Sequence, residues 1–206
     1  MSQSASAAQA APAQSKKLNG KDLINIGIYA AIYVVVMTAF AMLGLIPVLM
    51  PALCVIVPIA CGIPTMLFLT KVKKPGMVFI FSMICGIYLC ITGNGVVVFF
   101  VAVVTGLVSE LVLKSGGYQS SGRMIAAYAV FSLFVIGNFI PMWTDASYFA
   151  NLVGTGYTQE YANALQSLFP LWMLPVMLVT LFVSGLIGGC LGRAVLKKHF
   201  VKAGIA

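Results

Sequence analysis

Residues 47–70 read PVLMPALCVIVPIACGIPTMLFLT, a run without a charged side chain, and the basic group KVKK follows at 71–74. A helix needs about 20 apolar residues to cross the hydrocarbon core of a bilayer, so this run can span a membrane once. The whole chain has the same character, because 61% of its 206 residues are hydrophobic and 8% are charged, whereas a soluble domain carries roughly 25% charged residues. The composition predicts a multi-span membrane protein. It excludes an ordinary soluble enzyme, a disulfide scaffold and a disordered chain.

Six apolar stretches are suited to spanning, and none shows the alternation of a transmembrane β-strand. The expected spans are Leu23–Leu43, Pro47–Thr70, Met77–Thr92, Gly95–Leu113, Met124–Pro141 and Pro170–Leu196. Pro75-Gly76 and the run Thr92-Gly93-Asn94-Gly95 predict turns between spans. We therefore predict an all-α integral membrane bundle of six transmembrane helices over residues 21–199. A polar, disordered tail is expected at 1–20, a long loop at 142–169 and a short tail at 200–206.

The basic residues predict the orientation. With six spans, all twelve Lys and Arg fall on the side of the two termini, whereas the other side holds Asp145 and Glu160. By the positive-inside rule, both termini are expected in the cytoplasm of a cell membrane and the 142–169 loop outside. The net charge of +8 then reflects topology, and we expect no nucleic-acid partner.

The spans lack the ionisable residues of an ion-coupled transporter and the side chains of a catalytic or metal site. Glu110 lies near the cytoplasmic end of its span, four residues before Lys114, and is expected to form an interfacial ion pair, with a proton-relay role as the alternative. The single His199 has no partner for a metal site, and the five cysteines lie in apolar runs without a CxxC motif. We expect no metal, no cofactor and no enzymatic activity. The remaining classes are a binder, a channel or one subunit of a larger machine.

Two polar positions at the outer ends of spans are candidates for substrate binding. Asn94 offers a donor and an acceptor in the turn between the third and fourth spans. Asn138 lies in an apolar helix and should either bond to a neighbouring helix or face a cavity. Trp143 follows it and is either a ligand contact or an interfacial anchor.

The 142–169 loop supplies the other candidates. Breaks around Gly154 and Gly156 divide it into two short amphipathic pieces. A loop of this length is typical of a lid or a binding loop, although a helix pair resting on the bilayer is the alternative. The substrate-binding candidates from this region are Asp145, Tyr148, Tyr157 and Tyr161, with Trp172 at the start of the last span. Aromatic rings and two loop acids suggest a flat or cationic ligand.

The first span has small residues in its cytoplasmic half. Gly27 and Ala31 form a small-xxx-small pair, and Ala30 lies beside them. Small residues let helices approach closely in lipid. These three positions are expected either to pack inside the bundle or to dock another membrane subunit.

Several short strings of the sequence are informative when they are taken together. They are Asp22–Gly27, Gly62-Ile-Pro64, Phe68–Lys74, Leu113–Tyr118, Ala127–Ser132, Gly137, Pro141-Met142, Trp172–Pro175 and Leu196–Gly204. With these strings the chain resembles the substrate-binding (S) components of energy-coupling factor (ECF) transporters, and among them the Trep_Strep family. The resemblance covers about residues 20–206.

The resemblance implies a six-helix subunit that captures a vitamin or similar small micronutrient from outside. Such a subunit docks through small residues of its first helix, here matched by Gly27, Ala30 and Ala31, onto a transmembrane coupling subunit that carries two ATPases. Tyr29 and Tyr33 interrupt the usual alanine-rich pattern. The alternative function is a stand-alone channel or facilitator, whose polar path would use Thr38, Thr65, Ser82, Thr105, Ser109 and Ser132.

Overall fold

The structure is a computed structural model that describes residues 17–200. Residues 1–16 and 201–206, which hold most of the two predicted tails, lie outside this part. Six helices in the described part are long and apolar enough to cross a membrane, and no strand occurs there, so the predicted all-α, six-span class is confirmed. The spanning helices are α1 (Gly20–Ala41), α2 (Leu53–Lys71), α3 (Met77–Leu89), α4 (Val97–Lys114), α5 (Ser121–Ser132) and α9 (Met173–Val195).

Short helical turns extend or connect these spans. They are η1 (Met42–Leu45), η2 (Pro47–Leu49), η3 (Cys90–Asn94), η4 (Leu133–Asn138) and η5 (Leu196–Phe200). The second span therefore starts later than predicted, because Pro47 and Pro51 lack the N–H groups of a regular helix and the chain turns before Leu53. The fifth span changes from α5 to the tighter η4 at Ser132, whose hydroxyl bonds to the carbonyls of Ala129 and Leu181.

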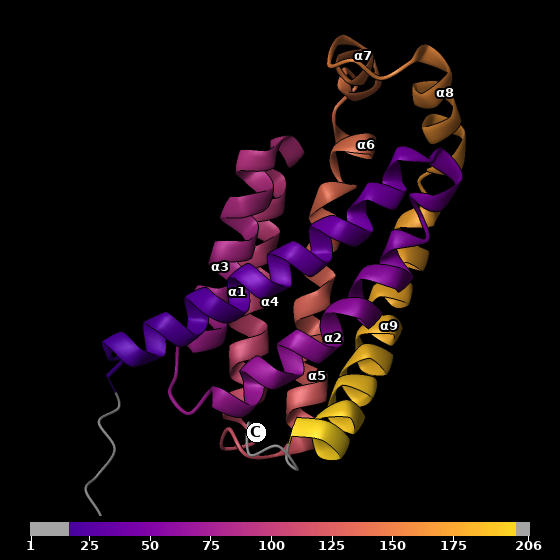
Figure 1. Ribbon diagram of the computed structural model, residues 1–206. Coiled ribbons are helices and arrows are strands. Elements are labelled where there is room, and N and C mark those ends of the chain that lie inside the picture. Colours follow the sequence, from indigo (N-terminus) through magenta and orange to yellow (C-terminus); the bar gives the residue numbers. More distant parts are fainter. Residues whose placement is uncertain (1–16, 201–206) are drawn as a thin grey trace, which may run out of the picture.

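The segment after η4 caps one end of the bundle (Figure 1). It contains α6 (Pro141–Thr144), α7 (Tyr148–Gly154) and α8 (Gln159–Leu168). The break between α7 and α8 contains Gly156, whose positive φ of 106° permits the turn. We call residues 141–169 the cap.

Glycines bring α2 and α9 into close contact. A Cβ atom on Gly62 would collide with the backbone of Gly188, and one on Gly188 would collide with the backbone of Pro58. Without side chains at these positions the two backbones touch, which is how small residues join helices in lipid.

Aromatic side chains fill the centre of the bundle. Tyr33 of α1 meets Phe81 of α3 and Phe131 of α5 edge-on, each with ring centroids 5.5 Å apart. Phe68 of α2 stacks on Phe81 at 4.6 Å, and Phe131 stacks on Phe134 at 4.8 Å. This aromatic core, defined by these five rings, is fully buried and joins α1, α2, α3, α5 and η4.

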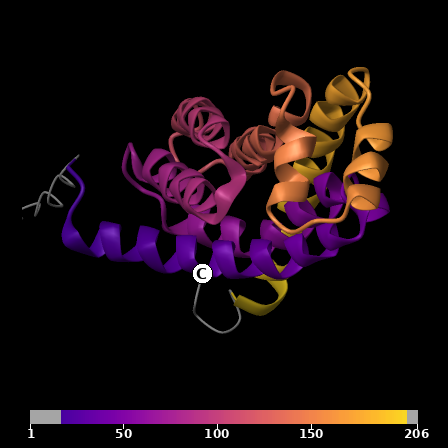
Figure 2. The ribbon, with the colours of Figure 1, turned by 90° about the horizontal axis from the view of Figure 1, so that it is seen from above.

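Helix α1 lies at the edge of the bundle. It crosses obliquely in Figure 1 and runs along one side in Figure 2. Only 22% of its spanning window is buried, compared with 33–56% for the other five. A capping box between Asn19 and Asp22 starts the helix, and a salt bridge of 2.7 Å joins Asp22 to Lys74 in the α2–α3 connection.

The described basic residues gather at the end opposite the cap, where α1 and α5 begin and α2, α4 and α9 end. We call this the basic end. That it faces the cytoplasm remains a prediction of the positive-inside rule.

Candidate substrate-binding site

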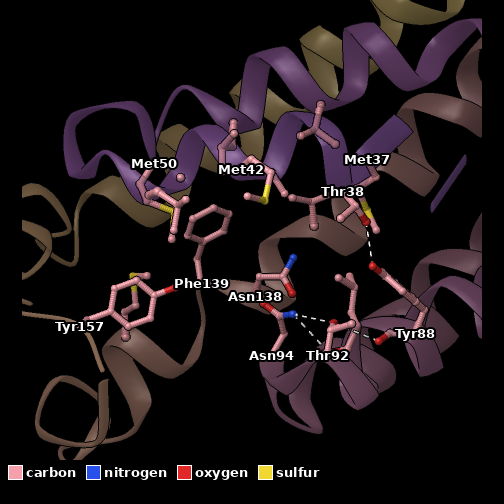
Figure 3. A pocket seen from close by; sticks show the side chains of 18 of the residues that line it. Met37, Thr38, Met42, Met50, Tyr88, Thr92, Asn94, Asn138, Phe139 and Tyr157 are labelled. Carbon is pink, nitrogen blue, oxygen red and sulfur yellow. Dashed lines mark hydrogen bonds between the residues drawn. The ribbon is translucent and has the colours of Figure 1, made fainter. Parts of the chain in front are cut away.

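A cavity of about 400 Å³ lies under the cap, between α1, the start of α2, the end of α3 and η4 (Figure 3). Roughly 300–1,000 Å³ is the range of pockets that hold small organic ligands. Most of the wall is apolar, and four methionines contribute to it: Met37, Met42, Met50 and Met142. Phe139, Tyr148 and Tyr157 supply aromatic rings.

The polar groups of the cavity gather on one side. The hydroxyls of Thr38 and Tyr88 are 2.8 Å apart and share a hydrogen bond between α1 and α3. Asn94 Nδ2 donates to Thr92 Oγ1 at 3.1 Å and to the Leu89 carbonyl at 3.3 Å. These bonds give the Thr38 and Tyr88 hydroxyls and the Asn94 amide nitrogen protein partners, as Figure 3 shows.

Asn138 is different. Its side chain reaches the cavity from η4, and its Oδ1 is buried without any hydrogen-bond partner in the described part of the chain. A buried amide oxygen without a partner costs about 1–3 kcal/mol, so native structures seldom leave one without a reason. The sequence left open whether Asn138 would bond to a neighbouring helix or face a cavity. The structure places it at the cavity.

The cavity is closed toward the basic end. Tyr33 precedes Met37 by one turn of α1, and Phe134 directly precedes the lining residue Val135, so the aromatic core lies directly beneath. Five hydroxyls of the alternative polar path bond to backbone carbonyls of the bundle: Thr65 to Cys61, Ser82 to Ala102, Thr105 to Val101, Ser109 to Ala127 and Ser132 to Leu181. They therefore line no polar route through the described bundle.

One long-range hydrogen bond fastens the cap to the bundle, and a second joins the cap to itself. Tyr161 OH in α8 donates to the Gly44 carbonyl in η1 at 2.6 Å. Trp143 Nε1 donates to the Phe169 carbonyl at 2.8 Å, which joins the two ends of the cap. Burial, with the neighbouring Tyr157 and Tyr148, raises the pKa of Tyr161 to about 12, so its hydroxyl keeps its proton at neutral pH.

The predicted binding residues divide into two groups. Asn94, Asn138, Tyr148 and Tyr157 line the cavity. The other four do not line the cavity: Trp143 and Tyr161 hold the cap, Asp145 is exposed, and Trp172 is 66% exposed.

Asp145 has a local structural role. Its Oδ1 accepts from the hydroxyl of Ser147 at 2.6 Å and from the backbone N–H of Ser147 at 2.9 Å, and these bonds lower the pKa of the carboxyl group. Glu160 is also exposed. The two loop acids therefore do not supply the negative charge that suggested a cationic ligand.

Sequence reasoning missed most of the lining, because it proposed only four of the nineteen lining residues for substrate binding. Thr38 was considered only for a channel, and Tyr88, Thr92, Phe139 and the methionines were not proposed as binding residues. The sequence could have indicated these residues only by their position, because each missed residue lies near the end of a span that is away from the basic residues. Apolar residues are so common in this chain that position alone does not distinguish residues that line the cavity from residues that pack in the core.

The small residues of α1 also divide. Ala30 is 1% exposed and packs inside the bundle, so it cannot belong to an outward docking face. Gly27 and Ala31 are exposed, and a Cβ on Gly27 would meet no atom within 4 Å. Ile24, Ile28 and Val35 are exposed beside them. We call these five residues the α1 outer face.

Glu110 does not form the predicted ion pair with Lys114. The carboxylate is 8% exposed, and Oε2 accepts from the backbone N–H groups of Val78 at 2.9 Å and Phe79 at 3.3 Å. Oε1 accepts from Tyr118 OH at 2.8 Å. Glu110 therefore caps the first turn of α3, where unpaired N–H groups favour an anion. Burial and the adjacent carboxylate raise the pKa of Tyr118.

Comparison with known proteins gives one match. Residues 20–202 match the family model of the Trep_Strep proteins, described as hypothetical bacterial integral membrane proteins. The chain belongs to the Trep_Strep family. No curated protein and no solved structure matches it. Membership in Trep_Strep agrees with the six spans and the bilayer environment that the composition predicts.

Proposed function

We propose that this Trep_Strep protein is the substrate-binding S component of an ECF-type importer in the bacterial cell membrane. In this proposal it binds a vitamin or similar small micronutrient in the cavity under the cap and has no enzymatic activity. It then docks on a transmembrane coupling subunit that is powered by two ATPases. The observation that carries the proposal is the cavity at the end away from the basic residues, with the unpaired Asn138 oxygen in its wall.

The absence of a route through the bundle favours a binder over a channel or facilitator. A channel needs polar groups along its length, and the bundle hydroxyls beneath the cavity are bonded to carbonyls. A protein that only binds needs a second component to release its cargo inside. The α1 outer face supports such a contact, because it is apolar, contains Gly27 and Ala31, and belongs to the least buried span.

Leucine substitutions on α1 test the proposal. Gly27→Leu and Ala31→Leu should leave substrate binding unchanged but abolish ATP-driven uptake in vesicles that contain the coupling module, because both side chains project from the bundle. Cys190→Leu, at an exposed position of α9, is the matched control and should leave both properties unchanged. Ala30→Leu should instead lower stability, because Ala30 is buried.

Two results would contradict the proposal. Uptake that survives both Gly27→Leu and Ala31→Leu would remove the α1 outer face as the docking surface. Substrate flux through vesicles that hold this chain alone would support the facilitator instead.

A further inference from the structure

The cavity wall has a chemical character that restricts its ligand. Among residues 17–198, no Asp, Glu, Lys, Arg or His lines it. A carboxylate, phosphate or ammonium group moved into this wall would lose its hydration without meeting an opposite charge, which is strongly unfavourable. The wall therefore selects for an uncharged molecule.

Among the described residues that line the cavity, Asn138 is the one whose buried side-chain oxygen has no hydrogen-bond partner. Oδ1 is buried and unpaired, and no hydrogen bond holds Nδ2 in the described residues. A free carboxamide presents an acceptor beside a donor. Its complement is a ligand edge that carries an N–H donor beside a carbonyl or ring-nitrogen acceptor. One hydroxyl of the Thr38–Tyr88 pair donates to the other, and the Asn94 amide nitrogen donates twice to the protein, so these groups have less hydrogen-bonding capacity left for a ligand than Asn138 has.

The apolar wall suits a flat ring system. Methionine thioethers adapt their shape and make favourable contacts with aromatic rings. Met42 and Met50 face the interior near Phe139 and Tyr157 in Figure 3. Aromatic side chains in the same wall can stack on or pack against a planar ligand.

We propose that the cavity binds an uncharged, flat heteroaromatic molecule whose edge, an N–H beside an acceptor, pairs with the Asn138 carboxamide. This proposal specifies the class of substrate. It rests on the proposed function in one respect, which is that the cavity under the cap is the binding site. It excludes carboxylate, phosphate and quaternary ammonium ligands.

A matched set of probes tests the class on the purified full-length protein in detergent. The set contains 2-quinolone, with an N–H beside a carbonyl, N-methyl-2-quinolone, the anion quinoline-2-carboxylate and the cation N-methylquinolinium. They are presented within a panel of flat bicyclic heteroaromatics in the same three charge states. Retained compounds are identified by mass spectrometry after gel filtration, and their affinities are measured by calorimetry.

The expected result has two parts. The retained compounds are neutral and carry the N–H edge, and N-methylation weakens binding about tenfold, the order of one well-made hydrogen bond. In Asn138→Leu the ratio between each N–H compound and its N-methyl analogue falls to about one. Asn163→Leu, at an exposed position of α8 outside the cavity, is the control and keeps the ratio.

The fold of the variant is checked separately. Asn138→Leu should not lower the unfolding temperature without ligand, because it removes an unpaired buried oxygen. If leucine does not fit, Asn138→Ala gives the same comparison with a smaller side chain. Retention mainly of charged compounds, a ratio that Asn138 does not affect, or retention of no panel compound would each overturn the inference.

Uptake assays separate this inference from the proposed function. ATP-driven accumulation of a charged compound would overturn the ligand class while supporting the S-component role. Asn138-dependent binding of neutral compounds, with no accumulation in vesicles that contain the coupling module, would support the ligand class and contradict the role.

Discussion

Asn94 and Asn138 show how neighbours decide the role of a residue. Both are asparagines near the cap end of a span, and both line the cavity. Asn94 uses its amide to hold the turn at η3, whereas Asn138 leaves its oxygen unpaired. The first contributes to local structure. The second is a destabilising feature that a bound ligand can relieve, as is often found where a protein gives up stability for function.

Glu110 is buried, and its role in the structure differs from the ion pair that the sequence predicted. Glu110→Ala should lower the free energy of unfolding by about 2 kcal/mol, because two N–H groups of α3 and the Tyr118 hydroxyl lose a charged acceptor. Denaturant or thermal unfolding in detergent measures this. Lys114→Ala is the control and should have little effect. Equal losses in the two variants would restore the ion-pair interpretation.

At the scale of elements, the cap is held to the bundle at few points. Its contact with η1 includes the Tyr161–Gly44 hydrogen bond, and its ends meet through Trp143 and Phe169. The break at Gly156 lies between α7 and α8. A segment held by few bonds opens at lower free energy than a packed helix. We therefore expect the cap to be the element that moves when a ligand enters the cavity.

The pKa of Tyr161 gives a test of this contact. Because its folded pKa of about 12 lies above the ordinary value of 10, the stabilisation is fully present below pH 10 and is lost as the pH rises from 10 through 12. Tyrosinate absorbance, taken as the difference between wild type and Tyr161→Phe, should titrate near pH 12. A difference titration near pH 10 would mean that Tyr161 is not held at η1.

At the scale of the whole molecule, charge divides the protein into two ends. Asp22 and Lys74 form an ion pair at the basic end, whereas the cap end has exposed Asp145 and Glu160 and an uncharged cavity. By the positive-inside rule, the end of a membrane bundle that carries the Lys and Arg residues faces the cytoplasm. The cavity would then open to the outside of the cell.

Cysteine labelling in intact cells tests this orientation. In a background where Cys90 and Cys190 are replaced by serine, Asn163→Cys on exposed α8 should react with a membrane-impermeant maleimide. Lys198→Cys, at the opposite end, should react only after the cells are permeabilised. Buried Cys54, Cys61 and Cys85 serve as an unreactive background. Labelling of Lys198→Cys in sealed cells would reverse the topology and contradict import from outside.

Sequence reasoning found the six spans and the separation of charge, because length and hydropathy alone determine whether a helix can cross a bilayer. It also found Asn94, Asn138, Tyr148 and Tyr157, since polar or aromatic residues at span ends are rare enough to notice. It could not separate Ala30 from Ala31, because in lipid both the core and the surface are apolar.

The tertiary structure alone decided which residues meet. The Tyr161–Gly44 bond joins positions 117 residues apart, and the cavity takes its wall from α1, α3, η4 and the cap. Local sequence determines spans because the bilayer acts on each helix separately. A binding site depends on how the helices rotate and cross, which is set by packing contacts between segments far apart in the chain.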